Sequence, residues 1–102
     1  MSTSHARIEQ ILTENKIVLF MKGTQNFPMC GFSARACAIL QDMGVAFHDV
    51  NVLEDEEIRQ GIKEYGNWPT IPQLYVNKQL VGGSDIMMEM YQNGELQELI
   101  KN

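Results

Sequence analysis

Both cysteines of the chain lie in the stretch NFPMCGFSARAC, at positions 30 and 37. Cys30 follows a loop that contains Pro28 and stands directly before a segment with helical character. At the start of a helix, the free backbone N–H groups and the helix dipole favour an anion, which for cysteine is the thiolate. The thiolate is the form that attacks disulfides and binds metals. Cys30 is therefore the candidate nucleophile and the candidate metal ligand.

Ser33 stands where a protein with a C-x-x-C redox motif has its second cysteine. A serine hydroxyl cannot resolve a mixed disulfide, so a mixed disulfide at Cys30 has to wait for an external thiol. Cys37 lies two helical turns further on, about 10 Å along the helix axis. That exceeds the Cα separation of about 7 Å within which a disulfide forms. We therefore predict that Cys37 is a core residue and that Cys30 works without an internal partner.

The elements that position Cys30 follow from the hydrophobic pattern, which predicts the order α-β-α-β-α-β-β-α. A helix between the first two strands implies that they are parallel, and the short Asn77-Lys78 turn implies an antiparallel hairpin between the last two. The predicted fold class is α/β, with a mixed four-stranded sheet flanked by helices. The expected strands are 16–23, 45–52, 72–76 and 79–83, and the expected helices are 5–15, 33–44 with Ser33 as its N-cap, 55–66, and 84–101 with a break near Gly94.

Length and composition limit the architecture and the partners. A chain of 102 residues that is 44% hydrophobic builds one core, so we predict a single domain, residues 1–102. The formal charge of −5 argues against nucleic acid as a partner. The sequence has no apolar run near the roughly 18 residues of a membrane span, and its first residues do not follow the pattern of a secretion signal. Two cysteines without a disulfide framework suit a reducing compartment, and we predict a cytoplasmic protein.

Four blocks of sequence stand out by their order and spacing: MKG (21–23), CGFS (30–33), NWPTIPQLYV (67–76) and VGGSDI (81–86). Together they resemble the monothiol, CGFS-type glutaredoxins and especially their single-domain bacterial form. The resemblance implies a thioredoxin-like fold that binds glutathione and, as a homodimer, a [2Fe–2S] cluster bridged between two chains. The family usually has GGCD where this chain has GGSD, so a redox role for a thiol at position 84 is excluded.

The same resemblance implies a role for individual residues. Lys22 and Arg59 would face the glycine carboxylate of glutathione, and the backbone of Ile71, before a cis proline, would pair with its cysteinyl part. Ser84 and Asp85 would hold the γ-glutamyl end, and Cys30 would be the cluster ligand. These residue types suit a tripeptide with two carboxylates and one amine, because an extended X-Pro segment offers backbone groups and a helix start offers N–H groups. For Arg59 a second interpretation stays open, namely surface ion pairs with neighbouring acids.

Two functions from different classes follow from these residues. The leading hypothesis is a carrier that assembles or transfers [2Fe–2S] clusters, as a homodimer or with a BolA-like protein, and delivers them to recipient iron–sulfur apoproteins. A cluster needs four ligands, typically thiolates, and one chain offers one well-placed cysteine. The alternative is a glutathione-dependent oxidoreductase in which Cys30 attacks protein–glutathione mixed disulfides. On the leading hypothesis, oxidoreductase activity is weak or absent.

Overall fold

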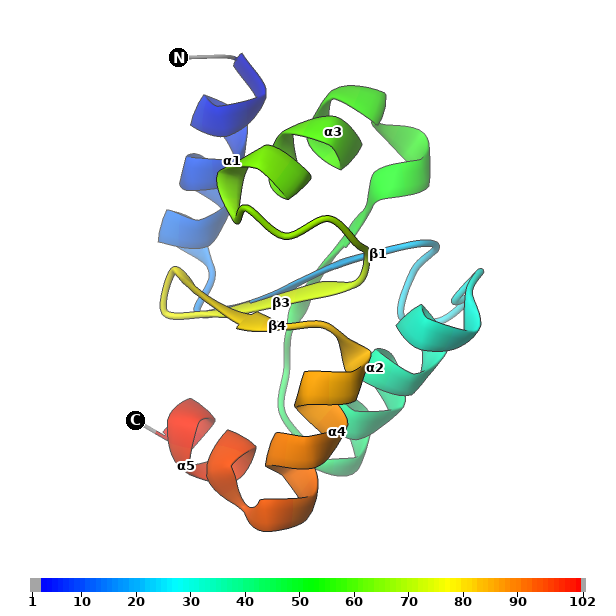
Figure 1. Cartoon of the computed structure of the whole chain (residues 1–102), viewed down its shortest axis with the longest axis vertical. Coiled ribbons are helices and arrows are strands. Elements are labelled where there is room, and N and C mark those ends of the chain that lie inside the picture. Colours follow the sequence, from blue (N-terminus) through cyan, green and yellow to red (C-terminus); the bar gives the residue numbers. More distant parts are fainter. Residues whose placement is uncertain (1–2, 102) are drawn as a thin grey trace.

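The computed structural model of the chain describes residues 3–101 and contains one four-stranded sheet with helices on both faces (Figure 1). The elements follow the predicted order, and the last predicted helix is divided in two by Gly94, which has the left-handed φ of 86°. They are α1 (Thr3–Glu14), β1 (Ile17–Met21), α2 (Gly31–Asp42), β2 (His48–Asn51), the 3-10 turn η1 (Val52–Glu54), α3 (Glu56–Tyr65), β3 (Gln73–Val76), β4 (Gln79–Gly82), α4 (Ser84–Asn93) and α5 (Glu95–Lys101).

The sheet has the strand order β2-β1-β3-β4. β1 pairs parallel with β2 and antiparallel with β3, and β3 pairs antiparallel with β4. The hairpin turn between β3 and β4 has positive φ at both Asn77 and Lys78, which matches the right-handed twist of the strands it joins. The predicted mixed sheet, with one parallel pair and a terminal hairpin, is confirmed.

The central strand β1 is buried along its whole length and divides the interior into two cores. Ile17, Leu19 and Met21 point to one face, where α2, α4 and α5 pack, while Val18 and Phe20 point to the other, under α1 and α3. Figure 1 shows these two helical layers on opposite sides of the strands. A strand covered on both faces needs apolar residues at successive positions, which is why β1 reads as a continuous apolar run.

The start of α2 differs from the prediction, and the start of α3 adds a capping residue to it. The prediction that Ser33 caps α2 is wrong: the helix begins at Gly31, and Cys30 is its N-cap. Ser33 is fully buried inside the first turn, where its hydroxyl accepts a hydrogen bond of 3.0 Å from the backbone N–H of Lys22. In α3, Asp55 is the N-cap and accepts from the N–H of Ile58 at 3.2 Å.

Four segments meet at one end of the sheet. The carboxyl end of β1 leads into the loop before α2, and α2 and α4 both begin there, packed against each other. The loop between α3 and β3 reaches the same end. Within residues 3–101, no helix is both long and apolar enough to span a bilayer.

Candidate functional site

A pocket of about 540 Å³ lies where these segments meet. All the residues that the sequence predicts for the site line it, although they come from the residue after β1, the N-cap of α2, from α3 and α4, and from the loop before β3. The tertiary structure therefore brings together side chains that lie up to 63 positions apart in the sequence. The predicted residues in its lining are Lys22, Cys30, Arg59, Ile71, Ser84 and Asp85.

Cys30 is partly exposed at the edge of this pocket, in the extended conformation of an N-cap. The pKa of its thiol is lowered, chiefly because the backbone N–H of Ser33 stabilises the thiolate, and the N–H of Phe32 and the charge of Lys22 add to this effect. Partial burial acts in the opposite direction and is the weaker influence. The predicted helix-start thiolate thus has the electrostatic surroundings that it needs.

Large apolar side chains are exposed on both sides of Cys30 in the sequence. Phe27 is 78% exposed, Met29 69% and Phe32 56%. Phe32 also lines the pocket, whereas Phe27 and Met29 lie in the loop before α2. We call Phe27, Met29 and Phe32 the apolar rim. Exposed apolar side chains that gather in one place mark contact surfaces more often than scattered ones do.

One end of the pocket is cationic. Arg59 and Lys63 lie one helical turn apart on α3, and Lys22 joins them from the end of β1. The alternative interpretation of Arg59 is wrong, because in the described part of the chain it forms no ion pair with an acid, and its Nε is buried without a hydrogen-bond partner. Sequence reasoning missed Lys63, although its i, i+4 spacing from Arg59 places both side chains on one face of α3.

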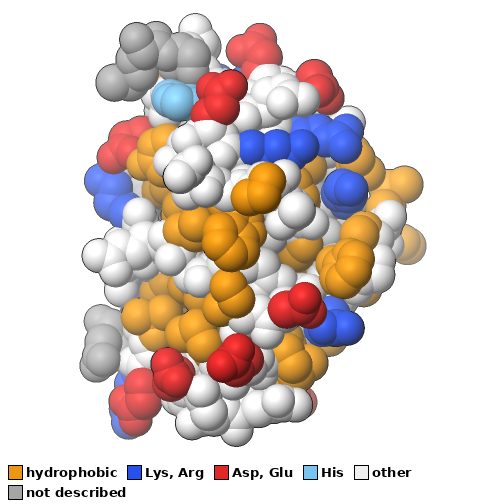
Figure 2. Space-filling view, viewed as in Figure 1, with side chains coloured by type: hydrophobic (Ala, Val, Ile, Leu, Met, Phe, Trp, Pro, Cys, Tyr) orange, Lys and Arg blue, Asp and Glu red, His pale blue; other side chains and the backbone are white. Residues whose placement is uncertain are grey.

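The opposite end of the pocket is formed by the start of α4. Gly83 is the N-cap, Ser84 is buried in the first turn, and Asp85 follows it on the surface. Asp85 Oδ1 lies 3.0 Å from Nη1 of Arg35 on α2. Sequence reasoning missed Arg35 because nothing in the linear sequence links two residues 50 positions apart. Figure 2, drawn from the same side as Figure 1, shows a band of hydrophobic side chains with basic side chains directly above it and acidic ones further up, and with acidic side chains and a neighbouring basic one below it.

Between the two ends, the loop before β3 supplies backbone rather than charge. The peptide bond between Ile71 and Pro72 is cis, as the resemblance implies. Among residues 3–101, the turn, loop and cap hydrogen bonds do not include the N–H or the carbonyl of Ile71. The backbone of Ile71 is thus available at the wall of the pocket.

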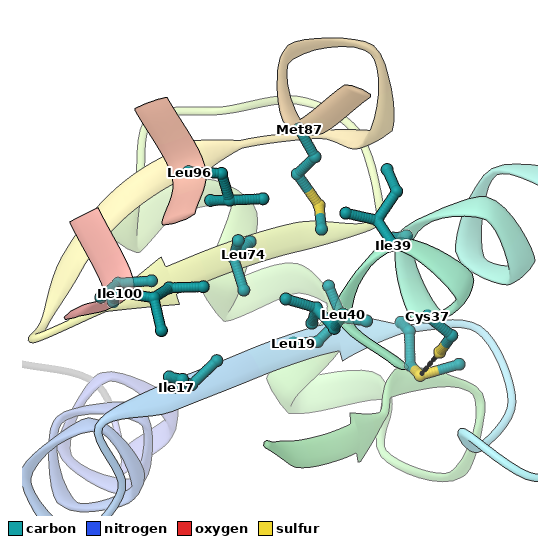
Figure 3. Close-up of a cluster of buried hydrophobic side chains, with 12 residues drawn as sticks. Ile17, Leu19, Cys37, Ile39, Leu40, Leu74, Met87, Leu96 and Ile100 are labelled. Atoms are coloured by element: carbon teal, nitrogen blue, oxygen red, sulfur yellow. Dashed lines mark hydrogen bonds between the residues drawn. The ribbon is translucent and has the colours of Figure 1, made fainter. Parts of the chain in front are cut away.

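Cys37 lies in the core and not in this pocket. Its side chain is 2% exposed, and its Sγ lies 3.4 Å from Sδ of Met21 (Figure 3). Burial raises the pKa of the Cys37 thiol to about 11, with a smaller contribution from Asp49. The prediction that Cys37 is a packing residue is confirmed, and Cys30 is the one reachable thiol of the chain.

Comparison with known proteins assigns this architecture to a family. The sequence profile of the family described as Glutaredoxin matches residues 17–81, which is more than half of the chain. The chain is also 62% identical over 96 residues to the "uncharacterized monothiol glutaredoxin ycf64-like" of Synechocystis, covering 94% of this chain and 90% of the relative. This chain belongs to the glutaredoxin family, in its monothiol group. The glutaredoxin is similar in structure to reduced apo GrxS14 of poplar, with a TM-score of 0.84 and 49% identity, covering 94% of this chain and 88% of that one.

More distant glutaredoxins share the fold alone. The crystal structure of a buckwheat glutaredoxin–glutathione complex has a TM-score of 0.86 at 19% identity, covering 96% of this chain and 87% of that one. The predicted thioredoxin-like architecture of this glutaredoxin is confirmed by these likenesses.

The ligand chemistry that one glutaredoxin chain offers is limited. Residues 3–101 contain no group of three or more histidine, cysteine, aspartate or glutamate side chains placed to hold a metal ion. The Cys30 thiol is partly exposed and has a lowered pKa, whereas Cys37 is enclosed in the core.

Proposed function

We propose that this single glutaredoxin domain, residues 1–102, binds glutathione and carries a [2Fe–2S] cluster that it shares with a second copy of itself. The observation that carries the proposal is the partly exposed Cys30 thiol, with its lowered pKa, at the edge of a pocket lined by Lys22 and Arg59 and by Asp85. The cluster is cargo, and the function is the assembly and transfer of iron–sulfur clusters in the cytoplasm.

The pocket suits glutathione in charge and in shape. Lys22 and Arg59 bind the glycine carboxylate, and the backbone of Ile71 pairs with the cysteinyl residue in the manner of an added strand. At the other end, the N–H groups at the start of α4 accommodate the γ-glutamyl carboxylate, and Asp85 attracts the ammonium group. The complex of the buckwheat glutaredoxin with glutathione supports this choice of ligand.

The number of thiolates supports a shared cluster. Four ligands are typical for a [2Fe–2S] cluster, and each chain contributes Cys30 alone. Two Cys30 thiolates and the thiolates of two glutathione molecules complete the set. Because half of the ligands are exchangeable small molecules, the cluster is released readily, as a carrier requires.

The apolar rim supports association next to Cys30. Phe27, Met29 and Phe32 expose apolar surface in the loop before α2 and in its first turn, and a second copy that approaches Cys30 would cover part of it. A BolA-like protein in place of the second copy, and recipient apoproteins during transfer, would approach the same end of the molecule.

The lowered pKa of Cys30 favours one competing function, glutathione-dependent thiol–disulfide exchange. In this reaction the Cys30 thiolate attacks the glutathione sulfur of a protein–glutathione disulfide and releases the protein thiolate. A free glutathione thiolate then attacks the resulting mixed disulfide, forms oxidised glutathione and regenerates Cys30. The absence of a second cysteine at position 33 makes every turnover depend on external glutathione.

The deciding experiment is anaerobic reconstitution with iron and sulfide, with and without glutathione, followed by visible absorption and iron analysis. We expect thiolate-to-iron bands only with glutathione, at about one cluster per two chains and in a dimer by size. Cys30→Ser should abolish the bands, and Cys37→Ser, the matched control, should retain them.

The oxidoreductase function predicts rapid turnover and no cluster. Rapid turnover of a glutathionylated peptide with no cluster formed in any reconstitution would overturn the carrier proposal. A stable shared cluster with negligible turnover would exclude the oxidoreductase.

A further inference from the structure

Strand β3 begins with a buried amide. The side chain of Gln73 is 0% exposed, although its neighbours on the same face of the sheet belong to a hydrophobic core that includes Ile71 and Tyr75. An amide in such surroundings destabilises the fold unless its donors and its acceptor are all satisfied. Its partners therefore show what the amide stabilises.

Both donors of the Gln73 amide bind the loop that lines the pocket. Nε2 donates to the carbonyl oxygen of Trp68 at 2.9 Å and to that of Thr70 at 3.2 Å. Trp68 and Thr70 both line the pocket, and Ile71 follows them directly. One side chain thus holds two carbonyls of the segment that precedes the cis proline.

Tyr75 fixes which way the amide points. Its hydroxyl donates to Oε1 of Gln73 at 3.2 Å, so the amide oxygen faces Tyr75 and the NH₂ group faces the loop. Tyr75 is buried, and burial raises its pKa to about 12, which keeps the hydroxyl protonated at physiological pH. Gly66 makes room for this arrangement, because a Cβ there would lie 2.3 Å from the Tyr75 oxygen.

The planarity of the peptide bond carries this constraint to Ile71. The carbonyl of Thr70 and the N–H of Ile71 belong to the same trans peptide unit and point in opposite directions. Because the Thr70 carbonyl is held towards the buried Gln73, the N–H of Ile71 is directed away from it. That N–H takes part in none of the turn, loop and cap hydrogen bonds among residues 3–101, and Ile71 lines the pocket.

We propose that Gln73 is a positioning residue for glutathione, acting through the Thr70 carbonyl to present the backbone N–H of Ile71 to the ligand. The inference rests on the proposed function, since it concerns the same pocket. Gln73 does not touch the ligand. It sets the orientation of the peptide that does, and Tyr75 keeps Gln73 in the required orientation.

The test compares two disulfides that react with Cys30 by the same chemical step. With oxidised glutathione, the Cys30 thiolate attacks one sulfur, forms a mixed disulfide and releases one glutathione thiolate. With hydroxyethyl disulfide, it releases mercaptoethanol thiolate in the same way, but the reagent lacks every group that the pocket recognises. The ratio of the two rate constants therefore reports recognition and cancels the reactivity of the thiolate.

We expect Gln73→Met, which keeps the length of the side chain and loses its donors, to lower this ratio by about tenfold. Tyr75→Phe keeps the amide and loses its orienting donor, so we expect a fall of about threefold. If Gln73→Met does not fold, Tyr75→Phe alone still tests the inference. Val76→Ala, a buried change in the same strand, is the matched control and should lower the thermal stability while leaving the ratio unchanged.

The outcomes separate this inference from the proposed function. If the wild-type protein prefers oxidised glutathione and both Gln73→Met and Tyr75→Phe retain that preference, the positioning role is wrong and the glutathione site stands. If Val76→Ala lowers the ratio as much as Gln73→Met, the effect is general destabilisation and the inference is also wrong. A wild-type protein without any preference would overturn both.

Discussion

Asp85 on α4 forms an ion pair with Arg35 on α2, with 3.0 Å between Oδ1 and Nη1. Both side chains are substantially exposed, Arg35 by 45% and Asp85 by 85%. The acid that would attract the ammonium group of glutathione therefore already has a cationic partner in the free protein. The ion pair also connects the two helices whose N-termini border the pocket.

Asp85 should matter to glutathione much more than Arg35 does. Asp85→Asn removes a charge-assisted contact worth about 1.5 kcal/mol or more, so we expect roughly tenfold weaker formation of the Cys30–glutathione disulfide at a fixed glutathione redox ratio. Arg35→Gln breaks an exposed ion pair, which limits its effect to about fivefold or less. Intact-mass spectrometry measures both. A larger effect from Arg35→Gln would show that Arg35 itself binds the ligand.

The reactivity of Cys30 should depend on pH in a defined way. Because the pKa of Cys30 is lowered, its alkylation by iodoacetamide should reach half of its maximal rate at a lower pH than that of an unstructured cysteine peptide. Lys22→Gln removes the positive charge that favours the thiolate and should raise this midpoint. Lys78→Gln, which removes a cation paired with Glu9 and absent from the pocket lining, is the control and should leave it unchanged.

The same lowered pKa predicts how stability depends on pH. Relative to Cys30→Ser, the thiolate stabilises the folded state fully above the ordinary thiol pKa. This contribution is lost as the pH falls through the lowered value. Chemical denaturation of the wild type and of Cys30→Ser across this pH range measures the difference between their free energies of unfolding. A difference that stays the same at every pH would contradict the lowered pKa.

Cys37 should be inert in the folded protein. Its burial and its pKa of about 11 predict that an aromatic disulfide reagent at pH 8 modifies one thiol per native chain and two per chain in guanidinium chloride. Cys37→Ser places a hydroxyl beside the Met21 sulfur and should cost about 1–3 kcal/mol of stability. Cys37→Ala, which buries no hydroxyl, should cost less. Rapid modification of both thiols in the native state would contradict the core assignment.

Lys63 should contribute to the recognition of the glycine carboxylate. Lys63→Gln leaves Lys22 and Arg59 in place and should weaken glutathione binding by about two- to fivefold, the usual range for a partly exposed charge pair. Glutathione with its glycine carboxylate amidated lacks the anion and should bind to the wild type and the variant equally. Calorimetric titration with both ligands tests this, and an equal loss for the two would assign Lys63 a role outside carboxylate recognition.

The features that were predictable from the sequence are those that depend on neighbouring residues. The apolar run of β1, the hairpin at Asn77-Lys78 and the acidic start of α3 each depend on residues close in sequence, so their structures follow from patterns and turn preferences. The resemblance added the glutathione and cluster residues, and all of them line one pocket. The prediction for Ser33 was wrong because its hydroxyl accepts from the N–H of Lys22, directly after β1, instead of capping the start of its own helix.

The sequence by itself determined the order of the elements, the mixed sheet, the lone reactive cysteine and the family. The tertiary structure alone decided that Lys63 joins the cationic end, that Arg35 pairs with Asp85, and that Gln73 holds the loop before Pro72. The physical reason is that propensities and periodicities act over a few residues, whereas these contacts depend on side-chain direction and on elements that only packing brings together.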